Sequence, residues 1–423
     1  MKRRSVMRWY QGAARVWVTL AAASAFLPVA TRVGWWVPLH LLAVGGVSVA
    51  ISGAEQMFVA ALTATPGAPG WLVTAQFVAL NAGAMLLVAG EMLERTVLLA
   101  LGGCAFLMGI FILGGIVVIA RRRSLVQRHR LPVAMYLAGL ACVAIGATFG
   151  ILIATGEVSD PAAWANLRSA HMVLNVLGFV TLTILATLIT FLPTVLRVRM
   201  PTWRGTLAAS LLVSGVGVTA AGLAFGNTAV AAVGSAVFVA GMVGFGSMVA
   251  RVLAVPRKWA IPTAGRHLIC GMAWLAGGSV WFAIECIWGV DVVATDVQRF
   301  VAVFACGWVL QILLGAWLFL LPMNRPAHPD VRRGYLAAMQ WLGVVEVAAF
   351  NLGWLSIALA GVSGPGDPVL SQIGTLLAEV GVGLALAKAW FYPTMAKFTF
   401  FTRGGAAVWA PVIDPPDRPG LAT

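Results

Sequence analysis

The sequence predicts an all-α, polytopic membrane bundle of about twelve transmembrane helices, and three observations support this fold class. Of the 423 residues, 61% are hydrophobic and only 10% are charged, whereas soluble domains carry roughly 25% charged residues. The apolar residues gather in runs close to the length of about 20 that a helix needs to cross a bilayer. Basic residues gather in alternate loops between these runs. Together these features exclude an ordinary soluble enzyme, a disordered chain and a fibrous protein.

Each apolar run is predicted to form one helix. The runs lack strand-like alternation and are too long for the strands of a membrane barrel. They are rich in Ala, Leu, Gly and Val, which suits close helix packing in lipid. The predicted spans are Val16–Val29, Trp35–Val59, Trp71–Gly90, Val97–Ala120, Pro132–Ala154, Ser169–Thr194, Thr206–Phe225, Val230–Leu253, His267–Trp288, Phe300–Leu321, Tyr335–Ala360 and Leu370–Phe391.

The distribution of Lys and Arg predicts the orientation of these spans. With twelve spans, 24 of the 28 basic residues fall on one side, including Lys388 near the end of the chain. Basic loops mark the cytoplasmic side, so we expect a protein of the plasma (inner) membrane with both termini cytoplasmic. Residues 1–410 form one transmembrane domain, and the Pro-rich residues 411–423 are expected to be a disordered tail. The net charge of +14 then reflects topology and contact with the lipid bilayer, and nucleic acid is not expected as a partner.

Two predicted spans resemble each other at an offset of 129 residues. Gly178 aligns with Gly307, and Pro193 aligns with Pro322. This similarity between spans six and ten suggests an internal repeat.

Two histidines are predicted to lie near the outer face of the membrane. His40 follows the start of span two, and His171 lies at a similar depth in span six, with Asn175 one turn further on the same helix face. Ionisable groups inside a membrane are costly and mark candidate functional sites. Imidazole is a ligand for heme iron, copper and zinc, and a buried histidine bonded to a neighbouring group is the alternative. His267 is predicted at the inner face, too far along the membrane to join this pair.

Three carboxyl groups lie inside predicted spans. Glu55 is placed in the inner half of span two, and Glu346 and Glu379 near the middle of spans eleven and twelve. A carboxyl group buried there is expected to be protonated or paired. It either belongs to a proton path or makes a hydrogen-bonded packing contact between helices.

Twelve helices with a histidine early in span two and another in span six resemble heme–copper oxidase subunit I and its NnrS-type relatives. The segments WWVPLHLLAVGGVSVAISGAEQMF and HMVLNVLGFVTLTILATLITFLPTVLRVRMP are also similar to actinobacterial membrane proteins labelled as copper-oxidase-like. The resemblance implies an arrangement with spans two, six and ten around one pore-like space. It implies that His40 is a heme ligand and His171 a copper ligand, with Arg168 and Asn175 beside them.

The same resemblance implies a role in nitric oxide, nitrite or copper handling or in respiratory electron transfer, with a redox or copper protein as partner. This sequence departs from the family at several positions. Span six has no HPEVY, span seven has no histidine and span ten has no HxH. We therefore do not expect oxygen reduction by this chain alone, and whether it is an enzyme stays open.

Two other functions fit the sequence. Twelve spans with both termini inside are typical of secondary transporters, and Glu55, Glu346 and Glu379 would then line a path together with Asn81. A non-catalytic membrane scaffold subunit would also need few polar residues. A heme absorption band would favour the metal-binding function, a substrate flux would favour transport, and the absence of both would favour the scaffold.

Overall fold

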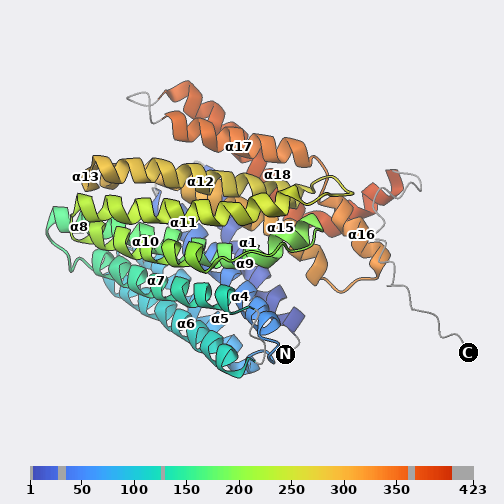
Figure 1. Ribbon diagram of the computed structural model, residues 1–423, viewed down its shortest axis with the longest axis horizontal. Helices are drawn as coiled ribbons and strands as arrows, with labels where there is room; N and C mark the ends of the chain where they lie inside the picture. The colour runs from blue at the N-terminus through green and yellow to red at the C-terminus, as the bar shows by residue number, and fades with distance from the viewer. Residues whose placement is uncertain (1–2, 27–34, 125–128, 361–366, 403–423) are drawn as a thin grey trace, which may run out of the picture.

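The computed structural model describes residues 3–26, 35–124, 129–360 and 367–402, and within these ranges the chain is helical with no strand. The long helices run side by side along one direction, with α8 and α13 at one end of the bundle and α16 at the other (Figure 1). One continuous set of buried apolar side chains extends from Tyr10 to Ala396. The described chain is therefore a single helical bundle.

Eleven helical stretches within the described residues are long and apolar enough to cross a membrane. They correspond to predicted spans two to twelve, which confirms a multi-pass helical membrane protein. The predicted first span, Val16–Val29, begins within α1 (Arg3–Phe26) and continues into residues 27–34, outside the described residues. Helix α1 is not among the eleven, and its sequence includes Arg8 and Arg15. The predicted tail 411–423 also lies outside the described residues, and the cytoplasmic location of both termini stays a prediction.

Three spans contain a π-helical segment. They are the second, sixth and tenth spans of the predicted order. Two-thirds or more of the apolar window of each is buried within the bundle, compared with half or less in the other spans. Their segments are α3 (Trp36–His40), η1 (Leu41–Val47) and α4 (Ser48–Leu62); α8 (Pro161–Val173), η2 (Leu174–Val180) and α9 (Thr181–Leu196); and α14 (Val297–Phe300), η3 (Val301–Leu310) and α15 (Gln311–Asn324).

A tightly packed helical hairpin follows each of these three spans. The hairpins are α5 (Gly70–Met92) with α6 (Thr96–Arg123), α10 (Thr206–Ala224) with α11 (Thr228–Ala254), and α17 (Gly343–Ala360) with α18 (Pro368–Thr402). One further helix packs against each π-helical span: α1, α7 (Arg130–Ala154) and α12 (Thr263–Trp288), respectively. The bundle therefore consists of three similar units of four helices.

In the first and third units, a close contact at a glycine joins the π-helical span to the helix before it. A Cβ atom added to Gly45 in η1 would lie 2.5 Å from the ring of Trp17, and one added to Gly307 in η3 would lie 2.5 Å from the ring of Trp274. In the second unit, Cys142 lies against Gly178 in the same way. The similarity between Gly178 and Gly307 in the sequence thus belongs to a pattern that repeats three times.

Local signals explain where several helices begin and end. Asp160 accepts a hydrogen bond from the Ala163 amide at 2.7 Å and caps α8, with Pro161 in its first turn. Asn227 caps α11 by accepting from the Val230 amide at 3.1 Å, directly after Gly226 at a positive φ of 64°. These residues turn the chain between neighbouring antiparallel helices.

The predicted span Tyr335–Ala360 was wrong in its first part. Tyr335 belongs to a separate short helix, α16 (Pro329–Ala338), and the chain turns before α17 begins at Gly343, with Leu342 at a φ of 48°. Glu346 therefore lies in the first turn of α17 and not near its middle. A short helix, α13 (Val290–Thr295), fills the corresponding connection at the opposite end of the bundle.

Candidate functional site

His40 is the last residue of α3, directly before η1. Its Nδ1 lies 2.8 Å from the carbonyl oxygen of Trp36, one turn earlier, and its ring stacks on the Trp36 ring with 3.7 Å between centroids. A carbonyl oxygen can only accept, so Nδ1 carries the proton and donates it. The lone pair of the imidazole is therefore on Nε2, which has no hydrogen-bond partner among the described residues.

His171 lies three residues before η2 and is held in the same way by a different helix. Its Nδ1 lies 2.7 Å from the carbonyl oxygen of Gly146 in α7. The ring occupies a notch on α7 that only glycine leaves open, since a Cβ atom on Gly150 would come within 2.6 Å of it. The Nδ1–H group again donates to a backbone carbonyl, so the lone pair is on Nε2.

No hydrogen bond or ring contact joins the two histidines within the described residues. They come from spans four helices apart, and their imidazoles lie close enough for their charges to interact. Metal-binding histidines generally donate the second ring N–H to a carbonyl or carboxylate, which fixes the tautomer and the ring orientation. Both His40 and His171 have this arrangement.

The two predicted supporting residues differ in their contacts. Asn175 lies beside His171: its Nδ2 donates to the His171 carbonyl oxygen at 2.7 Å and lies 3.2 Å from the His171 Nδ1. Arg168 instead reaches away to α13, where it donates to the Ala294 carbonyl oxygen at 2.6 Å, and its guanidinium stacks on Trp164. Asn175 therefore bonds to the backbone of His171 and lies beside its ring, whereas Arg168 joins α8 to α13.

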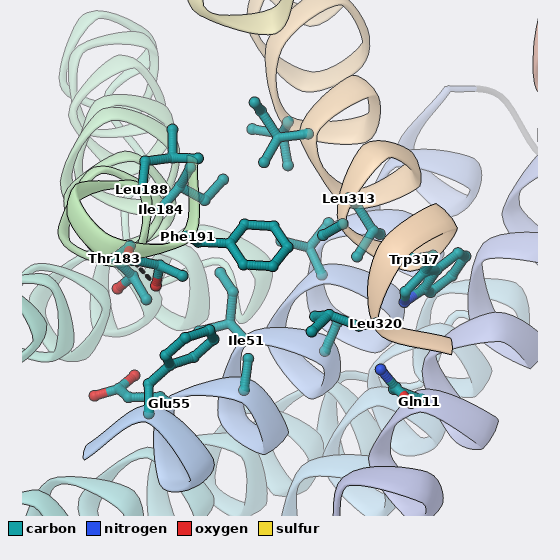
Figure 2. A pocket seen from close by; sticks show the side chains of 18 of the residues that line it. Gln11, Ile51, Glu55, Thr183, Ile184, Leu188, Phe191, Leu313, Trp317 and Leu320 are labelled. Carbon is teal, nitrogen blue, oxygen red and sulfur yellow. Dashed lines mark hydrogen bonds between the residues drawn. The ribbon is translucent and has the colours of Figure 1, made fainter. Parts of the chain in front are cut away.

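A cavity of about 90 Å³ lies further along the same spans (Figure 2). Spans two, six and ten all line it, and α1 adds Met7 and Gln11. The wall is mostly apolar, with Phe191, Leu313 and Trp317 among the labelled side chains. Its volume is about that of three water molecules in the liquid. Pockets for cofactors and other sizeable ligands generally occupy roughly 300 Å³ or more.

Glu55 in α4 lines this cavity and is buried, with 1% of its surface exposed. Neither of its carboxyl oxygens has a hydrogen-bond partner among the described residues. A carboxyl group in such a place is either protonated or hydrated by water in the cavity. Of the three predicted membrane carboxyl groups, Glu55 is the one that belongs to the lining of this cavity.

The donors present could hold a single metal ion or the iron of a heme. His40 and His171 offer two imidazole Nε2 atoms, and imidazole suits copper and iron. Within the described residues no group of three His, Cys, Asp or Glu side chains converges as a ligand set. A copper ion held by two imidazoles is compatible with these donors.

A second polar cluster joins His267, Glu346 and Lys388, all fully buried. His267 Nε2 lies 2.9 Å from Glu346 Oε1, and Lys388 Nζ donates to Glu346 Oε2 and to the Met339 carbonyl oxygen. The sequence does not predict this cluster, because His267 is expected as an isolated residue at the inner face and Lys388 as one of the basic residues of the cytoplasmic side.

The remaining predicted carboxyl group does not join either cluster. Glu379 is half-buried on α18, more than two turns before Lys388, and makes no hydrogen bond or ion pair with a described residue. Glu285, near the C-terminal end of α12, forms an ion pair with Arg299 at 3.4 Å. A continuous chain of Glu55, Glu346 and Glu379 is therefore not formed by direct contacts.

In comparisons with known proteins, no family and no curated protein sequence matches this chain.

Proposed function

We propose that this membrane protein binds a redox-active metal, copper or the iron of a heme, near the outer face through His40 and His171. The observation that supports this most is that the two imidazoles make the same kind of hydrogen bond. Each Nδ1 is engaged by a backbone carbonyl, which leaves each Nε2 available as a ligand. The resemblance to heme–copper oxidase subunit I and NnrS-type proteins points to the same two residues.

The chain's own groups define what such a site can do. His40 and His171 would hold the metal, and the Gly146 carbonyl would keep His171 in its orientation. Bound copper supplies one-electron chemistry and an open position for a small ligand such as nitric oxide or nitrite. Two protein ligands fall short of the set that oxygen reduction needs, so the proposed role is copper, nitrite or nitric oxide handling or electron transfer.

The experiment combines an absorption spectrum with metal analysis of the purified full-length protein from copper- and heme-replete cells. We expect about one copper per chain, lost in His40→Ala and in His171→Ala. His328→Ala is the matched control, because His328 is exposed in the connection before α16. A Soret band lost in the same two variants would identify heme in place of copper.

Wild-type protein without metal or heme from these cells would overturn the proposal. Metal that persists in both single variants would do so as well, because it would lie elsewhere on the chain. Thermal unfolding of each variant separates loss of the ligand from loss of the fold.

A second function, secondary transport, is favoured by one observation: Glu55 faces the central cavity with its carboxyl group unpartnered among the described residues. In a transporter this group would take up a proton or a cation at the centre of the bundle. A substrate-dependent flux in proteoliposomes that Glu55→Gln abolishes, with the metal content unchanged, would support transport. No flux above empty vesicles would exclude it for the substrates tested.

A further inference from the structure

A second, larger cavity opens at the end of the bundle opposite the histidine pair. It has a volume of about 500 Å³ and lies between α1, the end of α15 and α18. Three arginines line it: Arg8 near the start of α1, Arg15 about two turns later, and Arg325 directly after α15. The aromatic residues Trp390 and Tyr392 of α18 form another wall.

The fold holds Arg15 in place. Its Nη1 donates to the Ala389 carbonyl oxygen at 2.9 Å, its Nε donates to the Gln11 carbonyl oxygen at 3.3 Å, and its guanidinium lies 4.5 Å from the Trp390 ring centroid. These contacts leave its Nη2 group free for another acceptor. Arg15 is thus a rigid cation at the floor of the cavity.

The other two arginines lie at the exposed rim. Arg325 interacts with the hydroxyl group of Tyr392 and stacks on the ring of Tyr335 at 5.8 Å. Arg8 makes no hydrogen bond or ion pair with a described residue. Arg15 and Arg325 are near enough for their charges to repel each other.

No acidic residue lines the cavity, and no described carboxylate forms an ion pair with any of the three arginines. Three like charges around one space are unfavourable unless an anion joins them. Gln11, which is 4% exposed, lines both cavities, and its Nε2 group has no acceptor among the described residues. A bound anion would compensate the charges of the three arginines.

The geometry points to a binding pocket for a phosphate group. Guanidinium groups match phosphate oxygens in paired hydrogen bonds, which favours arginine over lysine in such sites. Basic pockets between helices at a membrane surface bind the headgroups of acidic lipids. The shared ligand chemistry is a phosphate anion, supplied either by the headgroup of a lipid or by a free phosphate compound.

Two binding assays on the purified full-length protein distinguish the sources. The first titrates inorganic phosphate by calorimetry into protein held in phosphatidylcholine nanodiscs. The second titrates phosphatidylglycerol into delipidated protein and counts retained lipids by native mass spectrometry. Arg8→Gln and Arg325→Gln are the test variants, because both side chains are exposed and their loss should leave the fold intact.

In the assay that detects the ligand, we expect each variant to weaken binding about fivefold and the double variant about 25-fold. Arg122→Gln is the matched control, since Arg122 is an exposed arginine at the end of α6, outside the pocket, and it should bind like wild type. An effect in the lipid assay alone assigns the pocket to a lipid headgroup, and one in the phosphate assay assigns it to a free phosphate. Binding that the double variant leaves unchanged in both assays, or no binding in either, would overturn the inference.

Discussion

Two equivalent places in the first and third units of the bundle contain different polar clusters. In the first unit, the Tyr10 hydroxyl donates to Gln76 and accepts from Gln56 Nε2 at 3.1 Å. In the third unit, His267 contacts Glu346, and Lys388 completes the group. The first cluster is neutral, whereas the third is built from ionisable groups.

The equivalence of the two clusters is visible in their surroundings. Tyr10 lies seven residues before Trp17, and His267 lies seven residues before Trp274. The indole of Trp17 donates to Asn81 at 2.8 Å, five residues after Gln76, just as the indole of Trp274 donates to Asn351 at 2.8 Å, five residues after Glu346.

The second unit shows what the scaffold itself requires. Cys142 occupies the position of Trp17 and Trp274 in the second unit. Met135, seven residues before Cys142, therefore occupies the position of Tyr10 and His267. Gly215 contacts Phe238 as Gly83 contacts Phe106, so Ala208, seven residues before Gly215, occupies the position of Gln76 and Glu346. Both residues are buried and apolar. The fold therefore accepts apolar, neutral polar or ionisable pairs, and the costly ionisable pair in the third unit marks it as a candidate for function.

The largest expected effect comes from breaking the charged cluster with Lys388→Met. This change leaves Glu346 buried without its cation and should lower the free energy of unfolding by about 3–5 kcal/mol. Denaturant unfolding in detergent measures it, with Lys397→Met as control because Lys397 is exposed on the same helix. The double variant Glu346→Leu with Lys388→Met should recover much of the loss. A Lys388→Met protein as stable as wild type would mean that the cluster is not held by its charges.

Gly45→Ala and Gly307→Ala test whether the two units pack alike. Each added methyl group would collide with a tryptophan ring, and overpacking of this kind costs about 1–3 kcal/mol. The two variants should therefore be destabilised to a similar extent in the same unfolding assay. Gly277→Ala on α12 is the control, since no atom lies within 4 Å of its added Cβ. A large loss at only one of the two positions would contradict equivalent packing.

Tyr10→Phe is expected to have a smaller effect, because the first cluster contains no charge. Removing the hydroxyl takes a donor from Gln76 and an acceptor from Gln56, at a cost of about 1–2 kcal/mol. The same unfolding assay compares this variant with Lys388→Met. A loss as large as that of Lys388→Met would show that charge is not what distinguishes the two clusters.

The smallest expected effect is the difference between Trp17→Phe and Trp274→Phe. Each removes one indole-to-asparagine hydrogen bond, worth about 1 kcal/mol in addition to the lost ring volume, and each asparagine keeps its bond to the carbonyl oxygen four residues earlier. The two losses in unfolding free energy should agree within about 0.5 kcal/mol. A clear difference would show that the two contacts are equivalent in position but not in energy.

Several of these features leave a signal in the sequence. The spacing of Gln76, Asn81 and Gly83 repeats in Glu346, Asn351 and Gly353, and Lys388 stands inside a predicted span. Of the repeats, only the similarity between spans six and ten is predicted above. Glu346 is predicted near mid-membrane because the apolar run from Tyr335 appears continuous in the sequence, whereas the chain turns just before Gly343.

The sequence by itself determined the class of the protein and the positions of most spans. A bilayer offers no hydrogen bonds to the backbone, so each crossing must be a helix with a long apolar run, and such runs can be read directly. Only the tertiary structure decided which polar side chains meet. His267 and Glu346 are 79 residues apart and Lys388 is 42 residues further along, and their contact depends on which helices become lateral neighbours. That choice depends on close packing of side chains around small residues, which hydropathy along a single helix does not encode.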